Sequence, residues 1–247
     1  MSKFFPWVLV TLLAAGTAQA AEKLRIGMEG NHPPFNNTDD SGQVVGFDAD
    51  LGMALCAKMK VECEIVTTPW DQLIPALSDN RFDFIMSSMS ITPERKQIVD
   101  FTDPYYLNKL QFVAAPEVQV TNDAASLMGK KVGAQRETLS AEWVQANASQ
   151  VADVQMFDDQ DALYNALATG QIDAALSDKY SAYEWLRTDA GKRFELKGEP
   201  VENADQIGIA VRLNDTLRAR LNLALKDAIA DGTFKRINDK YFPFSIR

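Results

Sequence analysis

The chain has 247 residues, 46% of them apolar, and a formal net charge of −9. This length and apolar content suit one large domain or two modest domains with packed cores, and they exclude a disordered chain. The negative charge argues against nucleic acid or an anionic membrane as the main partner, and it leaves room for a small cationic ligand.

The first twenty residues, MSKFFPWVLVTLLAAGTAQA, have the pattern of a secretory signal peptide. A lysine precedes a short apolar stretch, and Ala18-Gln19-Ala20 offers a small-x-small cleavage site. The apolar stretch is too short for a membrane-spanning helix, and no other stretch of the sequence approaches that length. We therefore expect a signal peptide at 1–20 and a mature chain that begins at Ala21.

The chain has two cysteines, Cys56 and Cys63, close together in the sequence. A secreted protein meets an oxidising compartment, where two such cysteines are expected to form a disulfide; two buried free thiols are the alternative. A metal site is not expected, because two sulfurs and one distant histidine do not complete a tetrahedral shell.

From Leu24 onward, strand-like and helix-like segments alternate. This alternation is typical of βαβ units, and it predicts an α/β fold with mostly parallel sheets. The tail at 214–241 is expected to form one or two amphipathic helices. The expected strands are LRIGME, CEIVTT, FDFIMSSM, KKVGAQ, VQMF and IDAALS, and the expected helices between them are GFDADLGMALCAKM, WDQLIPALSDN, TLSAEWVQANA and QDALYNALATG.

Two segments of the chain echo each other at a constant spacing of ninety residues. LIPALSDNRFDFIMS and LYNALATGQIDAALS share Leu, Ala, Asp and Ser at matching positions, including Asp83 with Asp173 and Ser87 with Ser177. Each segment is a helix, a tight turn and a buried strand, a unit that any α/β protein can contain. The constant register favours two related lobes.

Ligands of open α/β sheets bind at the carboxyl ends of the strands, where both echoes end in polar residues. The first echo leads into Ser87, Ser88, Ser90 and Arg95, and the second ends at Asp178. Arginine offers a fork for a carboxylate, and aspartate offers a charge for an ammonium. If the lobes face each other, these residues suit an amino acid, although Arg95 alone could be a surface residue and Asp178 alone a helix cap.

The sequence gives weaker support for catalysis and none for a cofactor. His32 is the one histidine, so a serine triad would have to use it, and a loop histidine is more often a surface or contact residue. The phosphate-binding patterns GxGxxG and GxxxxGK[ST] are absent, so we expect neither a nucleotide nor another cofactor.

These motifs resemble those of bacterial periplasmic solute-binding proteins of the polar amino acid type (family 3), nearest to the lysine/arginine/ornithine and histidine binders. The resemblance covers nearly all of the mature chain. It rests on PPFNN, GFDADLGMALC, LIPAL, DFIMSSMSITPERK, FTDPYY, IDAALSD and DGTFKRINDKYF.

The resemblance implies a two-lobed fold of type II, in which two hinge strands join the lobes. We expect lobe 1 at 21–107 and 208–247 and lobe 2 at 108–207, with crossings near Leu107–Leu110 and Ala204–Gly208. The cationic amino acid binders carry a disulfide at the place of Cys56 and Cys63, which favours the bonded alternative.

The resemblance also implies roles for single residues. Arg95 would hold the ligand carboxylate with Ser88 and Ser90 nearby, and Asp178 would hold the α-ammonium. The side chain of the ligand would lie beside Trp70. His32 stands where relatives have an aromatic residue, and Glu29 stands where the lysine/arginine binders have an aspartate that contacts the distal cationic group. Solvent exposure of Glu29 and core packing of Trp70 are the plain alternatives.

One loop departs from the family pattern of a glycine and two threonines. Its Glu137 either adds acidity to the pocket, together with Glu29, or pairs with the neighbouring Arg136. The candidate loop contacts with the ligand are Glu137, Thr138, Leu139 and Ser140.

The function implied is that of a periplasmic, monomeric binding protein for arginine, ornithine, lysine or histidine. It would deliver its ligand to an inner-membrane ABC permease without changing it chemically. The alternatives are another polar amino acid, an amino acid conjugate, and an enzyme similar to the cyclohexadienyl dehydratases.

Overall fold

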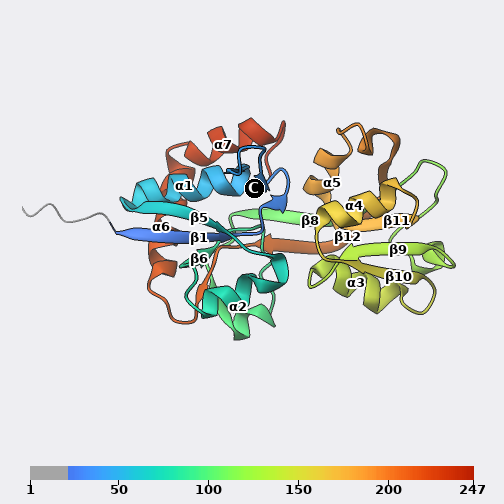
Figure 1. Cartoon of the computed structure of the whole chain (residues 1–247), viewed down its shortest axis with the longest axis horizontal. Coiled ribbons are helices and arrows are strands. Elements are labelled where there is room, and N and C mark those ends of the chain that lie inside the picture. Colours follow the sequence, from blue (N-terminus) through green and yellow to red (C-terminus); the bar gives the residue numbers. More distant parts are fainter. Residues whose placement is uncertain (1–21) are drawn as a thin grey trace, which may run out of the picture.

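The computed structural model describes residues 22–247, so the expected signal peptide lies outside the described residues. The chain forms two α/β lobes, and the strands β8 and β12 run from one lobe into the other (Figure 1). The two-lobed fold predicted from the sequence is confirmed. Within 22–247, no helix has the length and apolar character needed to cross a bilayer.

The first lobe contains a five-stranded mixed sheet in the order β5-β1-β6-β13-β7. The pairs β5-β1 and β1-β6 are parallel, and β13 is antiparallel to both of its neighbours. The strands are β1 (Lys23–Met28), β5 (Glu62–Thr67), β6 (Phe84–Ile85), β7 (Val99–Phe101) and β13 (Ala210–Arg212). The two antiparallel pairs make the sheet less parallel than the βαβ pattern alone suggests.

Helices cover both faces of this sheet. Three helices pack together on one face, and the short α2 lies on the other (Figure 1). They are α1 (Phe47–Met59), α6 (Leu217–Ala230), α7 (Thr233–Tyr241) and α2 (Leu73–Ser78). In α6, Leu217, Leu221 and Leu225 are buried four residues apart, as expected for an amphipathic helix.

The second lobe contains a five-stranded sheet in the order β10-β9-β11-β8-β12. Its first three strands are parallel, and β8 and β12 add antiparallel pairs. The strands are β8 (Tyr106–Ala114), β9 (Lys131–Gln135), β10 (Asp153–Phe157), β11 (Ala174–Asp178) and β12 (Glu195–Ile207), and the helices are α3 (Leu139–Ala148), α4 (Gln160–Ala168) and α5 (Lys179–Trp185).

A small antiparallel sheet, which the sequence analysis does not predict, follows β1. It carries His32 toward the second lobe. Its strands are β2 (Asn31–His32), β3 (Asn36–Thr38) and β4 (Val44–Val45), and single turns of 3-10 helix lie at Trp70–Gln72, Arg95–Gln97, Ala124–Leu127 and Gly191–Arg193.

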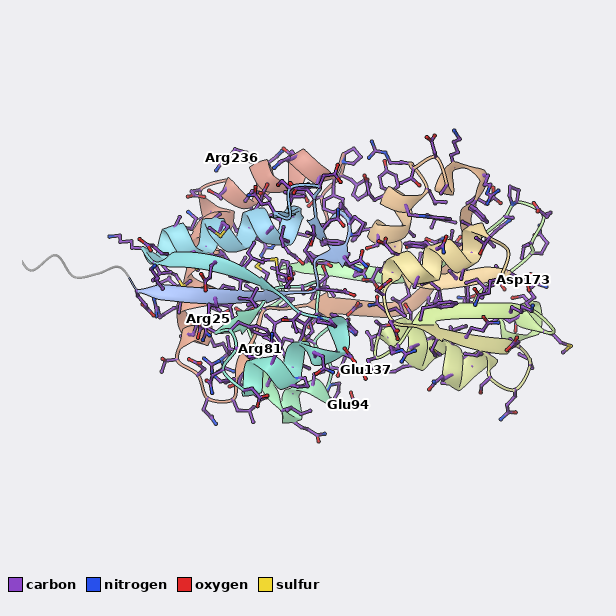
Figure 2. All side chains as sticks on the ribbon, in the orientation of Figure 1. Arg25, Arg81, Glu94, Glu137, Asp173 and Arg236 are labelled. Carbon is purple, nitrogen blue, oxygen red and sulfur yellow. A yellow bond between two sulfur atoms is a disulfide. The ribbon has the colours of Figure 1, made fainter. Side chains whose placement is uncertain are left out.

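The internal echo has a structural counterpart in two matching aspartates. Asp83 accepts a hydrogen bond from the backbone N–H of Arg25 at 2.8 Å, and Asp173 accepts one from the N–H of Lys131 at 2.7 Å. In each lobe the same helix-turn-strand unit is therefore fastened to the neighbouring strand by the same contact. Arg25 and Asp173 lie in different lobes (Figure 2).

The strand expected at FDFIMSSM is shorter than predicted, because β6 covers only Phe84–Ile85. Beyond it the backbone leaves the sheet, and Ser88 adopts a left-handed conformation with φ of 52°. This turn directs the serine segment into the space between the lobes.

The strands β8 and β12 form an antiparallel pair in which Asn108 lies opposite Asp205. Two irregularities in register, on either side of Val201, interrupt the pairing. The expected lobe boundaries at 107/108 and 207/208 fall on this pair and stay a prediction.

The expected disulfide is present between Cys56 and Cys63 and joins the end of α1 to β5. The helix α1 ends at Met59, and the left-handed backbone of the following Lys60 turns the chain toward β5.

Candidate functional site

A cavity lies between the lobes. Every residue expected in the ligand site lines it except Glu137, and their roles stay predictions. The first lobe supplies Glu29, His32, Trp70, Ser87, Ser88, Ser90 and Arg95, and the second supplies Gln135, Thr138, Leu139, Ser140, Gln160 and Asp178.

Arg95 begins the 3-10 turn after the serine segment, and its guanidinium is held by two backbone carbonyls. Nη1 donates to the Ser90 carbonyl at 2.9 Å, and Nη2 donates to the Glu137 carbonyl of the other lobe at 2.8 Å. The guanidinium carbon also lies 5.3 Å from the centre of the Trp70 ring. These contacts fix the orientation of the fork, which still has further N–H groups for a carboxylate.

Glu137 contributes its backbone rather than its side chain, which is exposed at the junction of the lobes (Figure 2). Its carbonyl accepts from Arg95 and, at 3.2 Å, from Trp70 Nε1. The residue has a left-handed φ of 58°. The alternative ion pair between Glu137 and Arg136 does not form, because Arg136 pairs with Asp158 instead: Arg136 Nε lies 2.8 Å from Asp158 Oδ1.

The next turn of this loop opens helix α3 beside the cavity. Thr138 caps the helix: its hydroxyl accepts from the N–H of Ala141 at 3.2 Å and donates to the Gln135 carbonyl at 2.7 Å. The first N–H groups of a helix have no partner within it, so this end suits an anionic group.

The three serines make three different contacts. Ser87 Oγ accepts from the N–H of Glu29 at 2.9 Å, Ser88 Oγ donates to Asp48 Oδ2 at 3.0 Å, and Ser90 Oγ donates to Asp205 Oδ2 at 3.1 Å. Each serine therefore ties the cavity wall to another element of the fold.

Asp48 is a buried carboxylate that supports this wall from behind. It accepts hydrogen bonds from Ser88, from Tyr105 Oη at 2.7 Å and from Asn36 Nδ2 at 3.3 Å. Burial raises the pKa of Asp48, and these donors lower it in part. The sequence analysis does not identify Asp48 as part of the site.

Asp178 ends β11 and precedes α5, but its side chain makes no capping hydrogen bond. Its Oδ2 lies 3.4 Å from His32 Nε2 across the cleft. The helix-cap alternative for Asp178 therefore does not account for its side chain, which faces the cavity.

His32 is buried between the lobes, where Nε2 also lies 3.0 Å from Ser181 Oγ. Burial lowers the pKa of His32, but the carboxylate of Asp178, with Glu29 and Asp48, raises it more, so the net direction is upward. Ser181 and Asp178 approach the same ring nitrogen, whereas a catalytic triad needs its serine and its acid on opposite nitrogens. This arrangement is not a serine triad.

Glu29 contributes a partly buried carboxyl group to the same cavity. Burial raises the pKa of Glu29 to about 7, and the positive charge favoured on His32 and a hydrogen bond from Gln135 oppose that rise. A cation placed beside Glu29 would lower this pKa again and would be held by the resulting charge.

Gln135 and Gln160 line the cavity and are missing from the residues expected from the sequence. Gln135 is the last residue of an apolar strand, and Gln160 is the first residue of a helix. The position of Gln135 at the carboxyl end of a strand is the one signal that could have indicated it.

In the described part of the chain, no group of three His, Cys, Asp or Glu residues is arranged to hold a metal ion.

The charged groups of the cavity suit a small zwitterion with an additional cationic end.

The chain is similar to binding proteins of known ligand. It is 37% identical over 244 residues to the L-arginine-binding protein of Pseudomonas aeruginosa, and this match covers 96% of this chain and 94% of that protein. It is 38% identical over 248 residues to the lysine/arginine/ornithine-binding periplasmic protein of Escherichia coli, with 97% of this chain and 95% of that protein covered.

The fold is similar to that of an ancestral arginine-binding protein bound to arginine, with a TM-score of 0.85 and 32% identity. The match covers 91% of this chain and all (100%) of that one. The model of one family matches residues 24–244. The chain belongs to the bacterial extracellular solute-binding proteins, family 3.

Proposed function

We propose that this protein is the periplasmic substrate-binding component of an amino acid ABC importer and that it binds a cationic L-amino acid. The candidates are arginine, ornithine and lysine, with histidine as a further member of the class. The observation that carries the proposal is one cavity with Arg95 in one lobe, Asp178 in the other and the carboxyl group of Glu29 beside them.

Each end of such a ligand has a complementary group. The α-carboxylate would bind Arg95 and the N–H groups at the start of α3, because both carry positive charge or partial charge. The α-ammonium would bind Asp178. The distal cation would bind Glu29, with Trp70 beside the aliphatic part of the side chain.

Binding of this kind explains how the ligand would close the cleft. Arg95 and Glu29 belong to one lobe and Asp178 to the other, so the ligand contacts both lobes only when they are together. A ligand shifts an equilibrium by its difference in affinity for the two states. The closed monomer would then dock on an inner-membrane permease and release its ligand unchanged.

The first test is calorimetric titration of refolded, ligand-stripped mature protein with the common amino acids, ornithine, citrulline and agmatine. We expect binding of arginine, ornithine or lysine, weaker binding of citrulline, which lacks the distal charge, and weaker binding of agmatine, which lacks the α-carboxylate. Binding of neutral or acidic amino acids alone would contradict the cationic class. Chemical conversion of the ligand would contradict the transport role.

Two variants test the contacts at the two ends of the ligand separately. Asp178→Asn should lower the affinity for every amino acid ligand, by roughly a hundredfold for one charge-assisted contact. Glu29→Gln should lower the affinity for the cationic ligands selectively and leave the affinity for citrulline unchanged. Glu117→Gln changes an exposed carboxylate and is the matched control. An equal loss for cationic and neutral ligands in Glu29→Gln would remove the basis for the ligand class.

The proposed role of Glu29 also has a pH signature. With a pKa of about 7, Glu29 is ionised above pH 7 and becomes protonated below it. The affinity for the cationic ligand should therefore fall between pH 8 and about pH 6, and this fall should be smaller in Glu29→Gln.

A further inference from the structure

The carboxyl group of Glu29 has a protein partner across the cleft. Gln135 Nε2, at the end of β9, donates to Glu29 Oε1 at 2.8 Å and also approaches the Asp158 carbonyl at 3.3 Å. Gln135 is 2% exposed, so this contact is made away from bulk water.

Three further side chains of the second lobe fix the direction of the Gln135 amide. Its Oε1 accepts from Gln160 Nε2 at 3.2 Å, and Gln160 Oε1 accepts from Ser177 Oγ at 3.0 Å. Ser177 Oγ lies 2.8 Å from Tyr164 Oη, and because its own proton goes to Gln160, the tyrosine is the donor. We call Tyr164, Ser177, Gln160 and Gln135 the amide relay.

Every donor of the amide relay points in the same direction, toward Glu29. All four members are buried, with exposures of 5%, 1%, 4% and 2% from Tyr164 to Gln135. A reversed Gln135 amide would set its oxygen against the Glu29 carboxylate and leave its nitrogen facing the donor of Gln160. With Glu29 ionised and the Gln160 amide as it stands, both contacts would then be repulsive, which favours the observed orientation.

The orientation matters because it places an N–H donor on one of the two oxygens of Glu29. The backbone N–H of Glu29 donates a hydrogen bond to Ser87 Oγ, so the main chain of Glu29 is also fixed in place. Among the hydrogen bonds of the described residues, the carboxyl group is engaged at Oε1 alone. A carboxylate oxygen can accept two hydrogen bonds, so a ligand N–H at Oε1 would have to share that oxygen with Gln135, whereas Oε2 is unshared.

The two kinds of cationic side chain use a carboxylate differently. A guanidinium presents parallel N–H groups and binds best to both oxygens at once, whereas an ammonium is a compact charge that one oxygen can hold. We propose that Gln135, held by the amide relay, is a selectivity residue that favours a ligand with a terminal ammonium over one with a guanidinium. This inference rests on the proposed function and on the role of Glu29 in it.

The test compares the dissociation constants of ornithine, lysine and arginine in the wild type and in Gln135→Leu. Leucine keeps most of the volume and cannot donate to Glu29. The affinity ratio of arginine to ornithine should rise by about tenfold, which corresponds to one hydrogen bond to a charged group. Gln171→Leu removes an exposed glutamine of the same lobe and should leave the ratio unchanged.

A second variant tests the relay itself. In Gln160→Leu the Gln135 side chain remains, but its oxygen loses its donor, so the ratio should move in the same direction by a smaller factor. If Gln135→Leu does not fold, Gln135→Asn keeps the polarity and shortens the reach, and it should give the same change.

The outcomes separate this inference from the proposed function. Binding of cationic amino acids with a ratio unchanged in both Gln135 variants would overturn the selectivity role and leave the function standing. Absence of binding for all cationic amino acids in the wild type would overturn both.

Discussion

Replacement of Asp205 by asparagine should stabilise the folded protein at neutral pH. Asp205 lies in β12 between the lobes, is 4% exposed, and accepts hydrogen bonds from Ser90 Oγ at 3.1 Å and Asn108 Nδ2 at 3.2 Å. Both contacts use Oδ2. Asp205 Oδ1 and Asn108 Oδ1 have no hydrogen-bond partner among the described residues. The ionised carboxylate is therefore buried with too few donors.

The magnitude follows from the pKa of this group. Burial raises the pKa of Asp205 to about 6 from the ordinary 3.8. At about 1.4 kcal/mol per pKa unit, the difference of about 2 units corresponds to roughly 3 kcal/mol. Because the folded state holds the proton more tightly, its stability falls as the pH rises from 3.8 through 6. Asparagine keeps one acceptor oxygen and has no such loss.

Urea unfolding, followed by circular dichroism at pH 4.5 and pH 8, measures the effect. Asp205→Asn should gain roughly 3 kcal/mol at pH 8 and roughly 1 kcal/mol at pH 4.5, with a rise in Tm of roughly 6 to 10 °C at the higher pH. Asp189→Asn changes a fully exposed carboxylate and is the control. A gain of the same size at both pH values, or none at pH 8, would show that the charge of Asp205 does not limit stability.

Three further substitutions test other features of the fold. Serine at both Cys56 and Cys63 should cost roughly 2.5 kcal/mol of unfolding free energy, because the disulfide closes a short loop; dithiothreitol should then no longer affect the variant's urea midpoint. Glu137→Gly should stabilise the protein by roughly 1 kcal/mol, since φ of 58° strains a side-chain-bearing residue, and a lowered Tm would contradict this. The ion pair between His32 and Asp178 should add stability fully present below pH 6.5 and lost as the pH rises through the raised pKa of His32. The difference in Tm between wild type and His32→Phe should accordingly be larger at pH 6 than at pH 8, and equal differences would argue against the pair.

The alternation of strands and helices was readable from the sequence because each unit has its own hydrophobic period and turn. The same logic indicated the strand ends at Ser87 and Asp178, which the structure brings to one cavity. Periodicity could not show that β6 is only two residues long, because an apolar run looks the same in a strand and in a buried turn.

The amide relay was beyond the reach of the sequence for a different reason. Gln135 and Gln160 belong to different elements, and a glutamine carries no charge and no pattern that reveals its partner. Glu137 was expected to act through its carboxylate, yet the backbone carbonyl is what contacts Arg95 and Trp70. Contacts of the backbone depend on its conformation, which side-chain identity does not specify.

The strand order has a consequence for the order in which the two lobes can fold. All strands of the second sheet, from β8 to β12, follow one another in the chain, so this sheet can assemble as soon as they have emerged. In the first sheet, β7 is hydrogen-bonded to β13, which is synthesised after the whole second sheet. A chain that emerges N-terminus first should therefore complete the second sheet before the first. The edge beyond β6 should stay open until β13 arrives, which makes the first lobe the part of the chain more exposed to wrong pairing during folding.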